Sequence, residues 1–194
     1  MAKRVFIIHG WEGYPEEGWF PWLRRELEKR GFIVTVPAMP EPAKPQINRW
    51  VRHLSALVGE PDENTYFVGH SIGCQAILRY LERLSGSRGV AGVVLVAAWT
   101  ILSPPAYATP EDQEIARPWI QTPLDWDAIR SRAKWWTGIF SDNDDFVPVQ
   151  SAEIFRSKLG AEIITEHNKG HFSGSDGVVE LPSALDAVLG YAAR

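Results

Sequence analysis

An apolar segment leads directly into a serine flanked by two glycines in the stretch Tyr66-Phe67-Val68-Gly69-His70-Ser71-Ile72-Gly73. Residues 66–68 predict a buried strand, and the apolar periodicity of residues 72–84 predicts a helix that begins immediately after it. The chain must turn sharply between them, and Gly69 and Gly73 provide the small neighbours that such a turn needs. We therefore expect the side chain of Ser71 to project beyond the end of the strand, beside the positive end of a helix dipole.

On both sides of this stretch, short apolar segments alternate with amphipathic ones. Further strands are predicted at residues 5–8, 32–36, 92–97, 134–140 and 162–166, and further helices at residues 19–30, 47–58, 127–132, 150–159 and 183–193. This alternation predicts an α/β fold with a mostly parallel six-stranded sheet and helices on both faces, in a single domain of residues 1–194. Residues 100–126 are expected to form a long loop or a small cap, because they are rich in proline and show no clear periodicity.

Charge and cysteine content exclude several classes of function. The net charge of −4 argues against nucleic acid as the main partner, because phosphate binding needs a basic surface. Cys74 is the only cysteine, which excludes an intrachain disulfide and a zinc–thiolate cluster. The apolar run at residues 5–8 is too short for a signal peptide or a membrane span, so we expect a cytoplasmic protein with no membrane partner.

Residues 69–73 match the pattern Gly-x-Ser-x-Gly, in which a serine on a strand-to-helix turn acts as a nucleophile. The alternative is a glycine-rich turn whose serine only caps the helix, but the flanking strand and helix favour the nucleophile. A dinucleotide site is not indicated, because residues 9–13 after the first strand read His-Gly-Trp-Glu-Gly and do not fit Gly-x-Gly-x-x-Gly.

A serine nucleophile needs a general base, and His171 is the best candidate because it follows the last predicted strand. The alternative for His171 is an ordinary loop histidine. His9 follows the first strand and His70 adjoins Ser71, so both compete for the role. We expect the His70 side chain to point away from the Ser71 hydroxyl, and His9 to shape the loop after the first strand.

The acid that orients the base is expected after the predicted strand at residues 134–140. Three carboxylates lie there, on Asp142, Asp144 and Asp145, and only one of them can orient the imidazole. The cluster could also be an exposed acidic turn. A calcium loop of the EF-hand type is not indicated, since its glycine and its terminal glutamate are missing. The residues by themselves leave the choice among the three aspartates open.

The remaining parts of a hydrolytic site are expected in the loops beyond the strand ends. The backbone N–H groups of Ile72 and Trp11 are the candidate oxyanion donors, and Gly10 allows a close backbone approach. The alternative is an ordinary turn after the first strand. Aromatic residues in these loops predict a shallow pocket for small or medium acyl groups. The residues expected to form it are His9, Gly10, Trp11, Trp99, Trp119 and Phe172. The alternative for the rings is that they only close the core.

Several segments together carry a family resemblance: Ile7-Ile8-His9-Gly10, Trp19-Phe20-Pro21-Trp22-Leu23, Met39-Pro40-Glu41-Pro42, Val68-Gly69-His70-Ser71, Val94-Leu95-Val96, residues 144–148 and Gly170-His171-Phe172. On these segments the chain resembles, over nearly its whole length, the small serine hydrolases of the YdeN and retinoblastoma-binding-protein-9 type. The resemblance implies a minimal α/β-hydrolase fold without a large lid, a Ser-Asp-His triad and weak esterase activity on short esters. It also implies peptidase-like activity in some members.

The resemblance also bears on the acid and on one protein partner. In hydrolases of this kind the acid commonly lies four residues before a proline, so counting back from Pro148 favours Asp144 over Asp142. Asn143 and Asp145 depart slightly from the usual neighbours of that acid. Retinoblastoma binding is not implied, because the L-x-C-x-E segment of those members is matched at neither end by residues 72–76.

The preferred hypothesis is hydrolysis of a small carboxylic ester by Ser71, Asp144 and His171, with no cofactor or metal required. A second hypothesis is an aminopeptidase-like amidase with the same triad. A carboxylate pocket would favour it, but Glu12, Glu16 and Glu17 near the candidate oxyanion loop are expected to form a solvated turn. A third is a protein-interaction module on a hydrolase scaffold. The partner expected under the first two is a small-molecule ester or amide, and the oligomeric state is not predicted.

Overall fold

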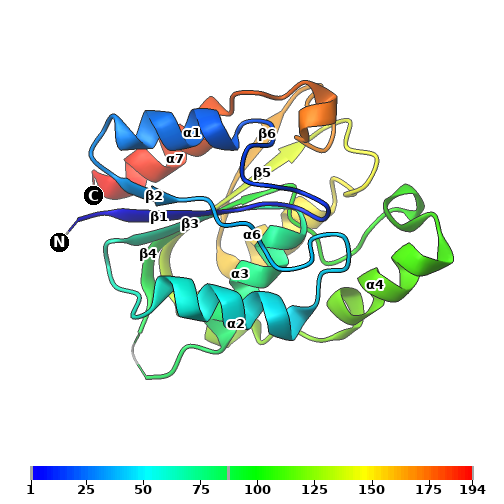
Figure 1. The fold of residues 1–194 in the computed structure, drawn as a ribbon, viewed down its shortest axis with the longest axis horizontal. Helices are drawn as coiled ribbons and strands as arrows, with labels where there is room; N and C mark the ends of the chain where they lie inside the picture. Colours follow the sequence, from blue (N-terminus) through cyan, green and yellow to red (C-terminus); the bar gives the residue numbers. More distant parts are fainter. Residues whose placement is uncertain (1, 87, 194) are drawn as a thin grey trace.

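In the computed structural model, which describes residues 2–86 and 88–193, the strands form one six-stranded sheet. They are β1 (Arg4–Ile8), β2 (Ile33–Thr35), β3 (Thr65–His70), β4 (Val90–Val96), β5 (Ala133–Ser141) and β6 (Glu162–Glu166). The strand order is β2-β1-β3-β4-β5-β6, and each neighbouring pair is parallel (Figure 1). The predicted α/β class and six strands are confirmed, and the sheet is wholly rather than mostly parallel.

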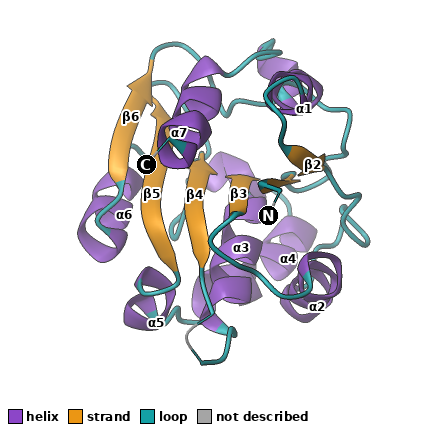
Figure 2. Ribbon diagram, turned by 90° about the vertical axis from the view of Figure 1, so that its left-hand side faces the viewer, coloured by secondary structure: helices purple, strands orange, loops and turns teal. Residues whose placement is uncertain are grey.

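The helices cover both faces of the sheet (Figure 2). They are α1 (Phe20–Glu28), α2 (Ile47–Val58), α3 (Ile72–Glu82), α4 (Pro110–Gln121), α5 (Trp126–Arg130), α6 (Ser151–Leu159) and α7 (Pro182–Ala192). One apolar core joins α1 and α7 to one face, and a second joins α2, α3 and α6 to the other. Within the described residues, no helix is long and apolar enough to cross a membrane.

The central strands explain why the two cores form. All residues of β3 and β4 are buried, as expected for parallel strands covered on both faces. Helix α3 is buried along nearly its whole length, from Ile72 to Leu81. It therefore lies in the interior, and its first residue is fixed directly above the end of β3.

The expected loop or cap at residues 100–126 contains a 3-10 turn (Pro104–Tyr107) and the helix α4. Thr109 begins the helix with a capping box: its hydroxyl accepts the N–H of Asp112 at 3.1 Å, and the Asp112 carboxylate accepts the N–H of Thr109 at 3.1 Å. Pro110 stands in the first turn, where its missing N–H costs little. The many prolines of this segment are one reason why no helix was predicted there, yet one of them, Pro110, favours the start of the helix.

Candidate active site

Ser71 has a backbone conformation that serine rarely adopts. It lies between β3 and α3 with φ at 52° and ψ at −121°. The strain is held by the surrounding backbone, because the N–H of Ser71 donates to the carbonyl of Val96 at 2.9 Å and its carbonyl accepts the N–H of Cys74 at 3.0 Å. Within the described residues its hydroxyl makes no helix-capping hydrogen bond. The turn therefore differs from the capping serine that was the alternative.

Two glycines bring the loop after β1 against this turn. A Cβ on Gly73 would lie 2.4 Å from the carbonyl oxygen of Ile8, so only glycine lets the start of α3 pack on the end of β1. A Cβ on Gly10 would lie 3.0 Å from Nδ1 of His70 and 3.5 Å from Cβ of Ser71. The segment that carries Trp11 therefore lies beside Ser71, as its predicted role as an oxyanion donor requires.

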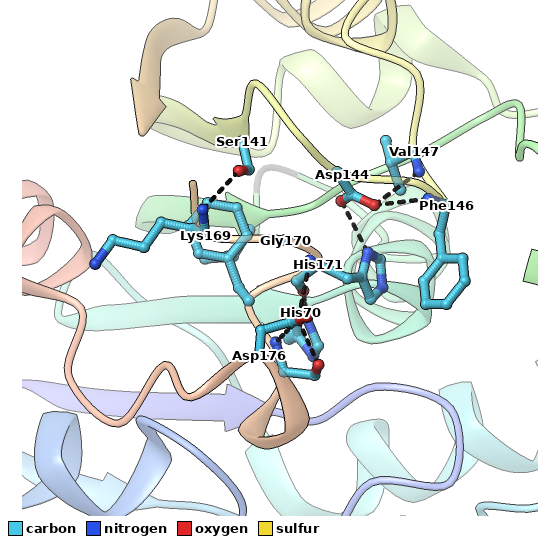
Figure 3. Close-up of polar contacts among 12 residues, drawn as sticks. His70, Ser141, Asp144, Phe146, Val147, Lys169, Gly170, His171 and Asp176 are labelled. Carbon is cyan, nitrogen blue, oxygen red and sulfur yellow. Dashed lines mark hydrogen bonds and ion pairs between the residues drawn. The ribbon is translucent and has the colours of Figure 1, made fainter. Parts of the chain in front are cut away.

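His171 is bonded to Asp144 (Figure 3). The distance from His171 Nδ1 to Asp144 Oδ2 is 2.8 Å, and the two side chains are 12% and 2% exposed. The other carboxylate oxygen of Asp144 accepts the backbone N–H groups of Phe146 at 2.8 Å and Val147 at 3.0 Å. Both oxygens of this buried carboxylate are thus held, and the acid presents one of them to the imidazole.

The other two aspartates of the cluster lie elsewhere. Asp142 accepts the backbone N–H of Asn168 at 2.9 Å and contacts Nδ1 of His167 at 2.6 Å. These two contacts lower the pKa of the Asp142 carboxyl, the backbone N–H contributing first. Asp145 is exposed. The structure therefore pairs Asp144 with His171, and gives Asp142 a separate, solvated histidine partner.

Two other histidines near the site have both their position and their protonation fixed by burial. His9 uses both ring nitrogens: Nδ1 donates to the carbonyl of Gly10 at 2.8 Å, and Nε2 accepts the N–H of Met39 at 2.9 Å. The Nε2–H of His70 donates to the carbonyl of His171 at 2.7 Å. Burial, followed by the proximity of His171, lowers the pKa of His70 to about 3. Burial therefore keeps both rings neutral and makes them weak bases.

Ser71 and His171 share one pocket at the carboxyl ends of the strands, with a volume of about 390 Å³. Four other predicted residues line it: Gly10, Trp11, Ile72 and Trp99. The pocket also has lining residues that the sequence pattern did not single out as substrate-binding: Glu12, Glu17, His70, Leu102, Ala106, Asp112, Phe146, Ser173 and Ser175. Of these, Phe146 could have been predicted from the sequence, since it lies two residues after the expected acid Asp144 and therefore close to the site.

Three residues expected in the pocket lie outside its described lining, which corrects the prediction. Trp119 is 1% exposed, and its indole donates to the carbonyl of Pro45 at 3.0 Å beneath α4. Phe172 is 1% exposed in the core with α1 and α7, and His9 is fully buried. Each ring closes the core behind the pocket wall, which was the alternative considered for Trp119 and Phe172.

Sequence comparison finds relatives over most of the chain. YdeN of Bacillus subtilis is 32% identical over 191 residues, which cover 98% of this chain and 97% of YdeN. The serine hydrolase RBBP9 of Rattus norvegicus is 26% identical over 160 residues, covering 82% of this chain and 80% of that protein.

Structure comparison gives the same result for the fold. The crystal structure of YdeN from B. subtilis matches with a TM-score of 0.90 at 31% identity, covering 100% of both chains. Est1E from Butyrivibrio proteoclasticus matches with a TM-score of 0.74 at 15% identity, covering 100% of this chain and 89% of that one. The second match shows a common fold alone. The fold is therefore that of the α/β-hydrolases, as the resemblance implied.

The family model for serine hydrolases matches residues 5–189, nearly the whole described chain. That range includes the strained turn at Ser71 and the bonded pair of His171 and Asp144. YdeN, which matches both in sequence and in structure, extends the similarity over the same range. This chain belongs to the serine hydrolase family.

Proposed function

We propose that this serine hydrolase cleaves small carboxylic esters through an acyl-enzyme on Ser71, with His171 as the base and Asp144 as the acid. The supporting observation is the buried bond of 2.8 Å between Asp144 and His171, whose ring lines the same pocket as Ser71. Because Nδ1 of His171 is occupied by the carboxylate, Nε2 is the nitrogen left to accept a proton. Ser71, which lines the same pocket as His171, is held at a strained turn.

The proposed reaction has two matched halves. Ser71 Oγ attacks the ester carbonyl carbon while His171 Nε2 takes the hydroxyl proton, and the N–H groups of Trp11 and Ile72 stabilise the oxyanion. The C–O bond to the alcohol then breaks, and His171 returns the proton to that leaving group. Water repeats the sequence on the acyl-serine, so that acid is released and Ser71 regains its proton. Asp144 stays ionised and stabilises the imidazolium that forms in each half.

The role of Ser71 is tested by ester turnover with Ser71→Ala against Ser157→Ala, which removes an exposed serine of α6 outside the described pocket lining. We expect Ser71→Ala to lower kcat by at least about a thousandfold without loss of the fold, since the nucleophile is removed. Ser157→Ala is expected to keep the activity of the wild type. Equal activity in the two variants would contradict the assignment, and a wild-type protein with no turnover on any ester would favour a binding role for the scaffold.

Pocket size bears on the acyl group. A volume of about 390 Å³, with Trp99, Leu102 and Phe146 in the walls, supports short or medium apolar acyl groups. A second structure of Est1E, which shares the fold at 13% identity, has ferulic acid bound to that protein. A series of p-nitrophenyl esters of increasing chain length tests this proposal. We expect kcat/KM to fall for long chains, and a clear preference for the longest chains would contradict it.

A second candidate is supported by the carboxylates of the pocket. Glu12, Glu17 and Asp112 line it, and among the described residues no lysine or arginine does. The Asp112 carboxylate is held in place by the backbone N–H of Thr109 at 3.1 Å. A negative lining favours substrates that carry an ammonium group, such as aminoacyl esters or amides. This corresponds to the amidase hypothesis, which needed carboxylates in the pocket rather than in a solvated turn.

Matched esters with an ammonium group or a methyl group at the same position separate the two candidates. The control is Glu16→Gln, since Glu16 adjoins Glu17 but does not belong to the described pocket lining. We expect Glu17→Gln to lower the preference for the cationic ester by about two- to fivefold, because one partly exposed carboxylate interacts weakly, and Glu16→Gln to leave it unchanged. The preference should shrink as salt is added. Equal rates on both esters would reject the second candidate and leave the first standing.

A further inference from the structure

The loop that carries His171 has left-handed backbone on both sides of the histidine. Gly170 has φ at 53° and Phe172 has φ at 59°. For a bulky residue such as phenylalanine this region is a real outlier, which persists only where the surroundings hold it in place. The position of His171 therefore depends on contacts to its main chain as well as on the bond between its ring and Asp144.

Two side chains hold the main chain of His171, one at its N–H and one at its carbonyl (Figure 3). Its N–H donates to Oδ2 of Asp176 at 3.0 Å, and its carbonyl accepts the Nε2–H of His70 at 2.7 Å. His70 ends β3, directly before Ser71, whereas Asp176 ends the 3-10 turn Gly174–Asp176. In a helix or strand these two backbone groups would bond to other backbone groups. Here the N–H and the carbonyl of His171 bond to side chains instead.

Asp176 is fitted closely to the loop. Its Oδ2 also accepts the N–H of Ser173 at 2.9 Å, so one carboxylate oxygen joins two backbone donors of the loop. Its Oδ1 occupies the space next to Gly170, where an added Cβ would lie 2.4 Å away. Gly170 is therefore needed both for its left-handed backbone and to leave room for this carboxylate.

We propose that Asp176, together with His70 at the carbonyl, is a positioning residue that holds the main chain of His171 so that the ring reaches Asp144 and Ser71 together. Asp176 is outside the described pocket lining, so it acts through His171 rather than on the substrate. The proposal rests on the proposed function of His171 as the base. Small displacements of a catalytic group cost roughly a hundredfold in rate per ångström, so holding this loop has a direct effect on kcat.

His70 suits its part because its charge state is constant. Burial lowers the pKa of His70 to about 3, so the ring stays neutral over the working range of pH. Its Nε2 must carry the proton, because a carbonyl can only accept. The Nδ1 atom of the same ring has no hydrogen-bond partner within the described residues. The donated bond to His171 is therefore the one described polar contact of this ring.

A purely structural role for Asp176 is the competing explanation, because it forms a capping box with Ser173 in the short turn. The matched control is Asp125→Ala, since Asp125 caps the start of α5 by accepting the N–H of Ala128 at 3.0 Å. A capping role predicts a similar loss of thermal stability in both variants and no specific loss of turnover.

The test measures kcat, KM and the rate of Ser71 modification by a fluorophosphonate in Asp176→Ala, Asp176→Asn and Asp125→Ala. We expect Asp176→Ala to lower kcat and the modification rate by roughly ten- to a hundredfold with KM within about twofold. Asp176→Asn, which keeps one acceptor oxygen, should restore part of the loss, and Asp125→Ala should keep wild-type rates. Unchanged kcat in Asp176→Ala, or a loss that appears only in KM, would overturn the proposal.

A double-mutant cycle with Gly170→Ala adds a second readout. The added Cβ displaces the Asp176 carboxylate, so the loss of kcat in Gly170→Ala should be smaller when Asp176 is already alanine. Losses that multiply independently would overturn the proposal. The proposed function fails separately: wild-type protein with no turnover and no modified Ser71 would overturn both, whereas an active wild type with an equally active Asp176→Ala overturns only the positioning role.

Discussion

Asp144 illustrates how much of a residue's chemistry is set by its hydrogen bonds. Three aspartates lie within four positions, yet one is 2% exposed and bonded to His171, whereas Asp142 contacts an exposed His167. Residue type and spacing alone left this choice open. It was the family spacing from Pro148 that favoured Asp144, and the bond to His171 agrees with it.

Neutralising the three aspartates one at a time should give graded losses. Asp144→Asn is expected to lower kcat by on the order of 10⁴, as in other triads, because the amide no longer stabilises the imidazolium. Asp142→Asn should cost less, and Asp145→Asn least. Steady-state kinetics with circular dichroism to check the fold would measure this order. If Asp142→Asn were the most damaging with its fold intact, the acid would have to be reassigned.

Buried neutral histidines should make the fold sensitive to acid. Burial lowers the pKa of His70 from 6.5 to about 3, so below about pH 6.5 the unfolded state binds a proton that the folded state does not. The free energy of unfolding should therefore fall as the pH drops from about 6.5 towards about 3. Burial also lowers the pKa of His9, which acts in the same direction.

Melting temperatures of wild type and His70→Gln at about pH 7.5 and about pH 4.5 test this linkage. We expect the melting temperature to drop between the two pH values by less in His70→Gln, whatever its stability at neutral pH, because one titrating group is gone. An identical drop in both proteins would show that His70 does not contribute.

At the scale of elements, the sheet and its covering helices follow from apolar patterns. The predicted strand at residues 92–97 corresponds to β4 (Val90–Val96), and the predicted helix at 47–58 has the bounds of α2. The cap helix α4 was missed because only Ala116 and Trp119 are buried on it, which leaves too short an apolar pattern to detect. The Thr109–Asp112 capping box was the signal that could have found it.

Arg79 of α3 anchors the C-terminal end of α4 through hydrogen bonds. This buried side chain of α3 donates to the carbonyls of Trp119 at 2.9 Å and Thr122 at 2.8 Å, at the negative end of the cap helix. Arg79→Met should lower the free energy of unfolding by about 2–4 kcal/mol, since one buried and one partly buried carbonyl lose a charged donor. The control is Arg83→Met at the residue that follows the same helix, which removes an exposed bond to Asn48 and should cost under about 0.5 kcal/mol. Denaturant unfolding measures both, and equal costs would contradict the anchoring role of Arg79.

For the whole molecule, the parallel sheet gathers the site from distant parts of the chain. Trp11, Ser71, Trp99, Asp144 and His171 follow β1, β3, β4, β5 and β6 in turn, so all lie at one edge. This much follows from sequence, because parallel strands place their carboxyl ends together. The contacts that hold the His171 loop could not be predicted, because side-chain bonds from His70 and Asp176 to backbone leave no periodic pattern.

The most direct test of Ser71 as the nucleophile, with His171 as its base, is the site and rate of modification by a fluorophosphonate, mapped by peptide mass spectrometry. We expect one adduct, on the peptide that contains Ser71, and a rate at least about a hundredfold lower in His171→Gln, since a general base contributes that much or more. An adduct on another serine, or an undiminished rate without His171, would contradict this mechanism.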